Sequence, residues 1–596
     1  MSSLRRTCFL VLSLSAWCHA EFIDGVSGRY LPRLDSVVAL QKSKGDRKVL
    51  AHAMQYMFPG HVTYDDSLYR PDGKARLTGG LFEEYPLHGF HAEADDLTLA
   101  TAKKEIELAL QAGIDGFIYF YTVHKTGVHP RLHNKLFTLF RAAEAVDAPF
   151  AITIALTPKF IGHERSVAEK VEVICRMLKT LMDEVGADHP NWLRAPDGAL
   201  ILYTHQAALI GKDVRYESDI LCWHETIDAK IGEIADAYYS VLETLDLDAH
   251  LVFRAVEKNL FARQRERFGL DAADLDRNYE AYLRAVCRHF PFVKFFRSDL
   301  YPAASRERSA AVAIIRENGR GFVGSVMIDS YTTRKFDENG RQIKRLKQIE
   351  APGFDPDSLH AKVGYTGNSH YFTRMWEWII DNDCVAAEII TWNDYLEGHA
   401  FAPTLNHHFG QHAMLKHFKC RWKTGHAPSY GSADFPEEVV VFFKKYKHGI
   451  EPTLFRYPLR KKIDFVPDDF YAKMVAYSNR MDVVTFLGSP AAIDINGERF
   501  TAGKGMTVLR VEPVLGRQHI RVMRNGTAVI DYTTTEGRTN NPYRTDRMTF
   551  IQSSRWKAYY RDAFPRAERL HYLHEYARDE DGVPHWRRLY PGLNAE

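Results

Sequence analysis

The first apolar run of the chain reads VLAHAMQYM over residues 49–57, and it begins the pattern that decides the fold. Seven more short runs follow before residue 393, and all eight are rich in β-branched and aromatic residues, which favour strands. The eight runs are Val49–Met57, Gly116–Tyr121, Phe150–Leu156, Ala199–Tyr203, His250–Ala255, Phe292–Phe296, Phe322–Ile328 and Val385–Trp392.

Amphipathic helices are predicted between these runs. Thr101–Ala112 carries apolar residues on one face and stops at Gly113, and Val167–Val185 and Asn368–Ile380 keep the same helical period. Strands that alternate with helices indicate a parallel sheet, and eight such units close a barrel. An open doubly wound sheet is the alternative, but no glycine-rich phosphate loop follows the first run. The sequence therefore predicts an α/β fold, a (β/α)8 TIM barrel.

A second, smaller domain is predicted after the barrel. A helix is expected from Pro436 to His448, capped by Gly449. From about Asp482 the apolar period changes to two, and Asn-Gly pairs mark two hairpins at Ala492–Phe500 and His519–Tyr532. We therefore expect a barrel over residues 45–475, a small antiparallel β-sandwich over 480–555 and a tail over 556–596.

The N-terminus has the pattern of an export signal. Arg5 and Arg6 precede an apolar stretch, and Cys18-His19-Ala20 resembles a cleavage site before Glu21. A cleaved signal over residues 1–20 predicts a secreted or periplasmic protein, and a buried N-terminal helix is the alternative. No other segment approaches the ~20 apolar residues of a membrane span, so no membrane association is expected.

The charges of the mature chain balance. Removal of residues 1–20 takes two arginines and no acids from a total of 78 Lys+Arg and 76 Asp+Glu. This balance favours a neutral ligand over nucleic acid or an anionic membrane. The five cysteines left are widely spaced with no CxxC pair, which excludes a dense disulfide framework and a cysteine zinc site; one disulfide stays open, and Cys175 is expected in the core.

The densest cluster of chemical groups follows the eighth run and reads TWNDYLEGH over residues 391–399. The C-terminal ends of barrel strands carry active sites. A pair of carboxyl groups, one protonated and one ionised, breaks glycosidic bonds, and Asp394 and Glu397 stand three residues apart. The alternative is a solvated loop with two ordinary acids. Glu388, six residues before Asp394, is expected deep in the barrel as a buried, hydrogen-bonded acid without a catalytic role.

The stretch EIITWNDY, residues 388–395, followed by Glu397, closely resembles the motif that ends the barrel of glycoside hydrolase family 71, the endo-α-1,3-glucanases called mutanases. Weaker likenesses are found at residues 49–54, 112–117 and 482–490. The resemblance implies hydrolysis of α-1,3-glucan with inversion. It assigns catalysis to Asp394 and Glu397. We take Asp394 as the base and Glu397 as the acid, an order that their spacing leaves open.

This chain also departs from the family pattern. Leu396 and Gly398 replace the usual Gly and Ser, and the third strand ends in Thr157-Pro158 in place of an acid. These departures leave two alternatives open. One is a related α-glycan hydrolase similar to the endo-α-mannosidases, which also have two acids three residues apart in a Trp-Asn segment. The other is a noncatalytic barrel that binds carbohydrate.

Further residues near the strand ends are predicted to line a pocket for an oligosaccharide or polysaccharide. Each has an ordinary structural alternative, as a core histidine, a packing tyrosine or a helix-capping acid. Pairs such as His88 and His91, or His407 and His408, lack a convincing ligand set, so neither a metal nor another cofactor is expected. The predicted substrate-binding residues are His52, Tyr119, Tyr121, Glu257, Asp329, Tyr331, Trp392, Asn393, Tyr395 and His399.

Overall fold

The computed structural model confirms the closed barrel. It describes residues 33–54, 58, 86, 97–124, 130–161, 165–205, 224–258, 269–296, 302–339, 343, 348, 351–353, 355, 358–364, 366–395, 397–404, 406–452, 459–461, 466–542 and 549–563. Eight parallel strands close in the order β1-β10-β7-β6-β5-β4-β3-β2. They are β1 (Val49–Ala53), β2 (Gly116–His124), β3 (Ala151–Phe160), β4 (Leu200–Thr204), β5 (Ala249–Arg254), β6 (Phe292–Lys294), β7 (Gly321–Val326) and β10 (Ala386–Ile389).

Each barrel strand falls on one of the eight predicted runs, because a strand of a parallel barrel is buried on both faces and reads as an unbroken apolar stretch. One apolar cluster fills the barrel near the N-terminal ends of its strands. It includes Leu50, Ile118, Val252, Phe292 and Val323. The opposite faces of the strands pack against the helices in a second, larger cluster.

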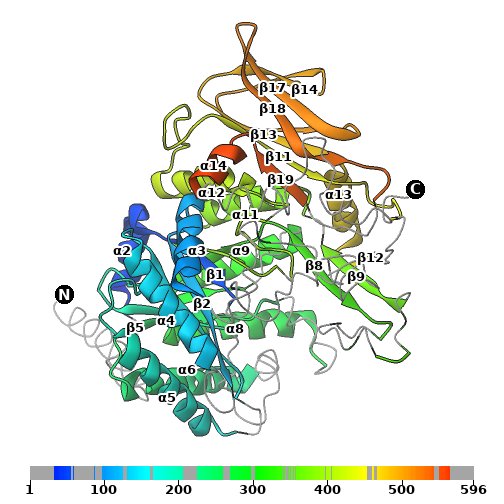
Figure 1. Cartoon of the computed structure of the whole chain (residues 1–596). Helices are drawn as coiled ribbons and strands as arrows, with labels where there is room; N and C mark the ends of the chain where they lie inside the picture. The colour runs from blue at the N-terminus through cyan, green and yellow to red at the C-terminus, as the bar shows by residue number, and fades with distance from the viewer. Residues whose placement is uncertain are drawn as a thin grey trace, which may run out of the picture.

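Helices cover the outside of the barrel (Figure 1). The N-cap Thr98 of α3 accepts a hydrogen bond from the Thr101 amide, and Gly113 ends the helix with a φ of 96°. Capping boxes begin α5 and α8. The covering helices are α3 (Leu99–Ala112), α4 (Pro130–Ala145), α5 (Val167–Val185), α6 (Ile227–Thr244), α8 (Ala272–His289), α9 (Pro302–Glu317), α11 (Ser369–Asp381) and α12 (Gly410–Thr424).

The helix predicted from Pro436 to His448 is wrong: residues Glu438–Lys444 form strand β11, and every residue of it is buried. The run Val439-Val440-Val441-Phe442-Phe443 consists of β-branched and aromatic residues, which fit a pleated sheet better than a helix. The Pro and Gly at the two ends suit the ends of a strand equally well.

Two antiparallel sheets form the C-terminal β-domain. The inner sheet has the order β16-β13-β11-β19 and the outer sheet the order β15-β14-β17-β18. Both predicted hairpins are confirmed: Asn496 and Gly497 turn with φ of 53° and 92°, and Asn525 and Gly526 with 49° and 80°. The further strands are β13 (Met481–Leu487), β14 (Ala491–Ile495), β15 (Glu498–Ala502), β16 (Gly505–Val511), β17 (Gly516–Arg524), β18 (Thr527–Arg538) and β19 (Thr549–Ser553).

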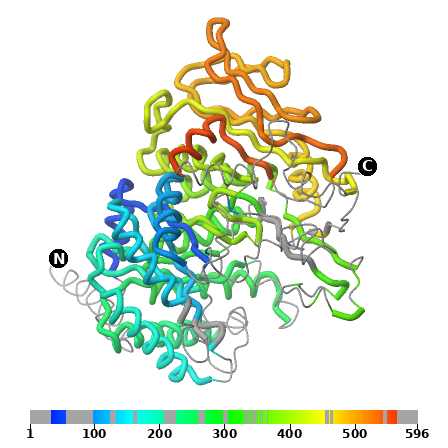
Figure 2. Tube along the Cα trace, in the orientation of Figure 1, coloured from blue at the N-terminus to red at the C-terminus, as the bar shows by residue number. Residues whose placement is uncertain are grey.

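The β-domain lies at one end of the molecule, with its inner sheet next to α12 (Figure 1). Buried polar contacts join the domain to the barrel, since Ser369 at the start of α11 donates from its backbone and its hydroxyl to Asp482 of β13. Figure 2 shows the last described segment returning to the early helix α3, where Gln111 donates to the carbonyl of Tyr559.

A small third sheet and several short elements complete the fold. The sheet has the order β12-β9-β8 and was not predicted. The remaining elements are β8 (Ser330–Phe336), β9 (His360–Gly364), β12 (Leu459–Lys461), α2 (Asp35–Lys42), α13 (Asp468–Asn479), α14 (Trp556–Ala563) and the 3₁₀ helices η2 (Lys44–Asp46) and η6 (His224–Thr226).

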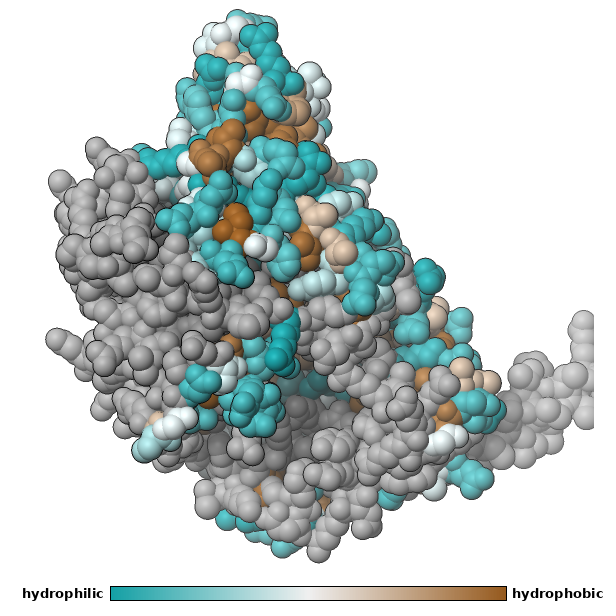
Figure 3. Space-filling model, turned by 90° about the vertical axis from the view of Figure 1, so that its right-hand side faces the viewer, coloured by the Kyte–Doolittle hydropathy of each residue, from teal (hydrophilic) through white to brown (hydrophobic). Residues whose placement is uncertain are grey.

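Exposed apolar side chains are scattered over the described surface (Figure 3). On the β-domain they include Val514 and Leu515, in the turn between β16 and β17, and Val508 and Val529. No helix within the described ranges is long and apolar enough to cross a bilayer. The expected export signal lies outside the described residues, as does Cys222, whereas Cys175, Cys287, Cys384 and Cys420 are free thiols.

Candidate active site

Three inward-facing side chains form a charged cluster in the barrel interior. Glu388 of β10 accepts a hydrogen bond from the Lys294 ammonium of β6 at 2.7 Å, and its Oε2 lies 2.9 Å from His52 Nε2 of β1. Lys294 Nζ lies 3.0 Å from the same imidazole nitrogen. None of the three side chains is exposed. The expectation of Glu388 as a buried, hydrogen-bonded acid is therefore confirmed.

Burial and mutual charge set the protonation of this cluster. Burial lowers the pKa of His52 to about 4, and the positive charge of Lys294 acts in the same direction. Burial raises the pKa of Glu388, but Lys294 and His52 outweigh it and hold the net pKa below the usual range. We therefore assign an ionised Glu388 and a neutral His52 at neutral pH, which makes the cluster a buried ion pair with a neutral partner.

A ring of larger side chains lies around His52. The ring centroid of His52 is 5.7 Å from that of Phe296, 6.4 Å from that of His205 and 6.5 Å from that of Phe120. Arg254 of β5 lies over Phe296, with its guanidinium carbon 4.8 Å from the ring centroid. Phe120, Arg254 and Phe296 are partly exposed. We call these four residues, Phe120, His205, Arg254 and Phe296, the mouth ring.

Tyr119 and Tyr121 do not line a pocket, which corrects their prediction. Successive side chains of a strand point to opposite faces, and Phe120, which lies between them, faces inward. The Tyr119 hydroxyl donates to the Leu132 carbonyl of α4, and the Tyr121 hydroxyl lies 3.0 Å from His133 Nε2 of the same helix. Both tyrosines are fully buried between the barrel wall and α4.

The segment after β10 is fixed to the end of β1. The Asn393 side chain accepts from the Met54 amide at 2.7 Å, and the Trp392 amide donates to the His52 carbonyl at 2.7 Å. The Trp392 indole points outward and donates to Glu105 of α3 at 2.6 Å. Trp392, Asn393 and Tyr395 are buried. The prediction that Trp392 and Asn393 contact substrate is corrected to a supporting role, because protein partners occupy their polar groups.

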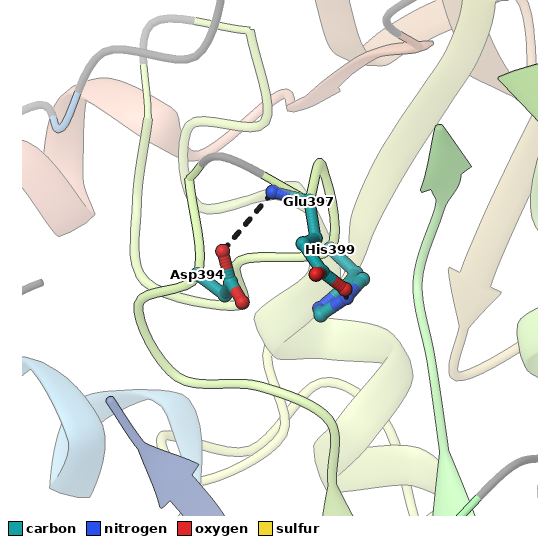
Figure 4. Close-up of side chains that lie close together, drawn as sticks. All are labelled: Asp394, Glu397 and His399. Atoms are coloured by element: carbon teal, nitrogen blue, oxygen red, sulfur yellow. Dashed lines mark hydrogen bonds and ion pairs between the residues drawn. The ribbon is translucent and has the colours of Figure 1, made fainter. Parts of the chain in front are cut away.

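Asp394, Glu397 and His399 come together on this segment (Figure 4). The Glu397 amide donates to Asp394 Oδ1 at 3.0 Å, and the Asp394 amide donates to the Thr391 hydroxyl. The Glu397 carboxylate points to the His399 ring, with Oε2 3.3 Å from Nε2. Asp394 and His399 are nearly buried, whereas the Glu397 side chain is 42% exposed. Asp394 and Glu397, three positions apart in the sequence, thus place two carboxylates of different solvent exposure side by side.

The same three groups have the chemistry of a divalent-cation site. One ligand atom from each of Asp394, Glu397 and His399 lies within 4.8 Å of the others. Two carboxylates and an imidazole suit several divalent metals. A carboxylate bound to a metal could not act as a proton donor, so metal binding and acid catalysis exclude one another here. The prediction of no metal stays a prediction.

The remaining predicted residues have different surroundings. Asp329 is buried and accepts from the backbone and the hydroxyl of Thr549 in β19, and it pairs with Lys444 of β11, so it joins the barrel to the β-domain. Its predicted pocket role is corrected on this ground. Burial lowers the pKa of Lys294, and Glu257, which is buried after β5, is near enough to oppose that shift. Tyr331 belongs to β8, outside the barrel, and its side chain is outside the described part.

The sequence prediction missed Lys294, Arg254, Phe296, Phe120 and His205. A usable signal was present, because the runs FVKFF (292–296) and LVFRA (251–255) each hold one charged residue within an apolar strand, as does AAEII (386–390). A buried charge is costly unless it is paired. A lysine and a glutamate in two such runs therefore indicate a contact across the barrel.

Comparisons with known proteins give distant structural matches. No family model matches the sequence, and no curated protein matches it. Among solved structures, the GH99 endo-α-mannosidase of Bacteroides thetaiotaomicron is 13% identical, with a TM-score of 0.37 over 60% of this chain and 88% of that one. The endo-β-1,4-mannanase of Thermotoga petrophila is 10% identical, with a TM-score of 0.38 over 83% and 98%. Barrels of this kind serve many activities, so this likeness does not assign one.

Proposed function

We propose that the protein is an exported glycoside hydrolase that cleaves α-glucosidic bonds, with α-1,3-glucan as the expected substrate. One observation carries the proposal: Asp394 and Glu397 lie side by side just after the last barrel strand, one nearly buried and one half-exposed. This is the end of the barrel where such folds hold their active sites, and two carboxylates in unlike surroundings can take the two roles that glycoside cleavage needs.

The surroundings suggest a role for each carboxylate. Asp394 accepts a hydrogen bond from the Glu397 amide, and such a bond stabilises the charged form of a carboxylate. Asp394 is therefore proposed as the ionised base. Glu397 is proposed as the acid, because its exposed side chain can reach a leaving oxygen. His399, beside Glu397, would orient that carboxyl group.

The spacing of the pair bears on stereochemistry. Inverting enzymes keep their carboxyl groups about 6.5–9.5 Å apart and retaining enzymes about 5–5.5 Å apart. Here the nearest ligand atoms lie within 4.8 Å. Inversion, which we propose from the motif, requires the exposed Glu397 side chain to turn away from His399 when substrate binds. Retention is the alternative that the observed spacing favours, and the anomeric form of the first product, followed by proton NMR, decides between them.

The test is product analysis with α-1,3-glucan, α-1,4-glucan and α-mannan. Wild-type protein is expected to release sugar from α-1,3-glucan. Asp394→Asn and Glu397→Gln should each lower turnover by a factor of about 10² to 10⁴, the usual contribution of an acid or base, while binding persists. Glu280→Gln, on the exposed face of α8, is the matched control and should keep full activity.

Other outcomes would replace the proposal. Products from α-mannan alone would indicate an endo-α-mannosidase-like enzyme. Binding without products from any glycan would indicate a noncatalytic carbohydrate-binding barrel. Activity that EDTA abolishes and a divalent cation restores would assign Asp394, Glu397 and His399 to a metal instead.

A further inference from the structure

Arg254, the last residue of β5, places a guanidinium group in the mouth ring. Its amide is fixed by a hydrogen bond to the Thr204 hydroxyl of β4 at 3.0 Å. Its side chain lies over Phe296, and its Nη1 is 3.4 Å from His205 Nε2. Stacking uses the flat face of a guanidinium and leaves the N–H groups at its edge available. The residue is thus held in place by groups that do not neutralise it.

No carboxylate pairs with Arg254 in the part of the chain that the structure describes. Several other arginines of low exposure pair with a carboxylate: Arg47 with Asp383 at 2.9 Å, Arg510 with Asp482 at 2.6 Å, and Arg524 with Glu437 at 2.7 Å. Arg320 and Arg538 donate to backbone carbonyls instead. A guanidinium has five N–H donors, and the contact with His205 occupies one of them at most. The partly exposed Arg254, at the C-terminal end of β5, therefore has further N–H donors available.

The charge of Arg254 affects the pKa values of neighbouring groups. Lys294 is neutralised by Glu388, but Arg254 adds a second positive charge that acts to lower the pKa of both His52 and Lys294. Glu257 acts on the pKa of Lys294 in the opposite direction. A guanidinium whose N–H groups are available can bind a carboxylate, sulfate or phosphate group by paired N–H bonds.

We infer that the mouth ring is a subsite for a negatively charged group on the glycan, a uronic carboxylate or a sulfate ester, held by the edge of Arg254. The inference rests on the proposed function for the hydrolysis of an α-glycan and changes the expected substrate from neutral α-1,3-glucan to an α-glycan that carries acidic groups, since the charge argument identifies only the anion. The segment that carries Asp394 is joined to β1 by Asn393 and Met54, and His52 of β1 contacts Phe296. The anion subsite and the carboxylate pair therefore share one end of the barrel.

The experiment measures binding, so it does not depend on turnover. D-glucuronate, D-glucose 6-sulfate and D-glucose are titrated into wild-type protein by saturation-transfer NMR. At least one of the two anionic sugars should bind about tenfold or more tightly than glucose, because a charge-assisted bidentate contact contributes at least the 1.4 kcal/mol that tenfold requires. The stronger of the two identifies the anion.

The variants Arg254→Gln and Arg254→Lys, with Arg284→Gln as the control on the exposed face of α8, complete the test. The preference should vanish in Arg254→Gln, shrink in Arg254→Lys, and be unchanged in Arg284→Gln. Equal binding of all three sugars to wild-type protein, or a preference kept by Arg254→Gln, would overturn the inference. If Arg254→Gln does not fold, the wild-type preference and its decrease in Arg254→Lys decide the matter.

The two proposals fail in different ways. The same titrations in Glu397→Gln keep Arg254 intact and should show the same anion preference. An anion preference without hydrolysis of any glycan would support the anion subsite and contradict the proposed hydrolase activity. Hydrolysis of neutral glucan without any anion preference would support the hydrolase activity and contradict the anion subsite.

Discussion

Glu388 and Glu397 lie nine positions apart on one continuous segment, yet their surroundings differ completely. Glu388 has no exposed surface and is held by Lys294 and His52. Glu397 is 42% exposed and contacts Asp394 through its amide and His399 through its carboxylate. The first acid is neutralised by a fixed partner inside the barrel, whereas the second is open to solvent.

This difference separates a structural acid within a barrel strand from the acid beyond the strand end that we propose as a catalyst. A buried charge needs a permanent partner, because the loss of hydration is several kcal/mol. A carboxyl group that exchanges protons with a substrate needs access to that substrate. The strand supplies the first environment and the segment beyond its end supplies the second. The following three predictions test this separation in order of decreasing effect.

The largest effect is expected from Lys294→Met. It leaves Glu388 buried without its cation, which costs about 3–5 kcal/mol of unfolding free energy, as measured by urea denaturation. The double variant Lys294→Met/Glu388→Met should recover most of that loss. Lys230→Met, which breaks an exposed pair with Glu233 on α6, is the control and should cost about 0.2–1 kcal/mol. A small loss in Lys294→Met would show that the cluster is not a tightly coupled pair.

The second effect is a loss of stability in acid that comes from His52. Its folded pKa is about 4, below the ordinary value of 6.5, so the unfolded chain binds a proton first as the pH falls. Stability therefore decreases from about pH 6.5 down to about pH 4. Wild-type protein should lose roughly 3 kcal/mol more than His52→Gln between pH 7 and pH 4, at 1.36 kcal/mol per unit of pKa.

Other buried histidines titrate in both proteins, among them His133, His370 and His417, each with its pKa lowered to about 4, mainly by burial. The difference between wild-type protein and His52→Gln therefore isolates His52. Parallel stability curves for the two proteins would contradict a neutral His52.

The smallest effect is expected from Trp392→Phe, next to the carboxylate pair. The loss of the indole donor to buried Glu105 should cost about 1–3 kcal/mol, with affinity for the glycan unchanged. Trp378→Phe removes an indole bond to the neutral Ser309 hydroxyl and should cost about 0.5–1.5 kcal/mol. A large fall in the affinity of Trp392→Phe for the glycan would show that Trp392 contacts the substrate after all.

Local sequence was sufficient for most elements and insufficient for strand β11 and for the three-stranded sheet. The eight strands, helices α3, α5 and α11 and the two Asn-Gly hairpins follow from apolar periodicity and turn residues, which act over a few positions. Strand β11 was mistaken for a helix because proline and glycine at its ends were weighed above its run of valines. The three-stranded sheet was missed because its strands, with the sequences SYTTRKF, HAKVG and LRK, lack the apolar runs that mark the barrel strands.

The sequence by itself determined that the chain closes a barrel, because strands buried on both faces have to be apolar throughout, and it placed Asp394 and Glu397 beyond the last of them. Only the tertiary structure decided which side chains face inward. A shift of one residue along a strand reverses the face of the sheet to which a side chain points. Phe120 therefore belongs to the mouth ring, while Tyr119 and Tyr121 point away from it toward α4. The pairing of Glu388 with Lys294, 94 residues apart in sequence, likewise exists only once the barrel has closed.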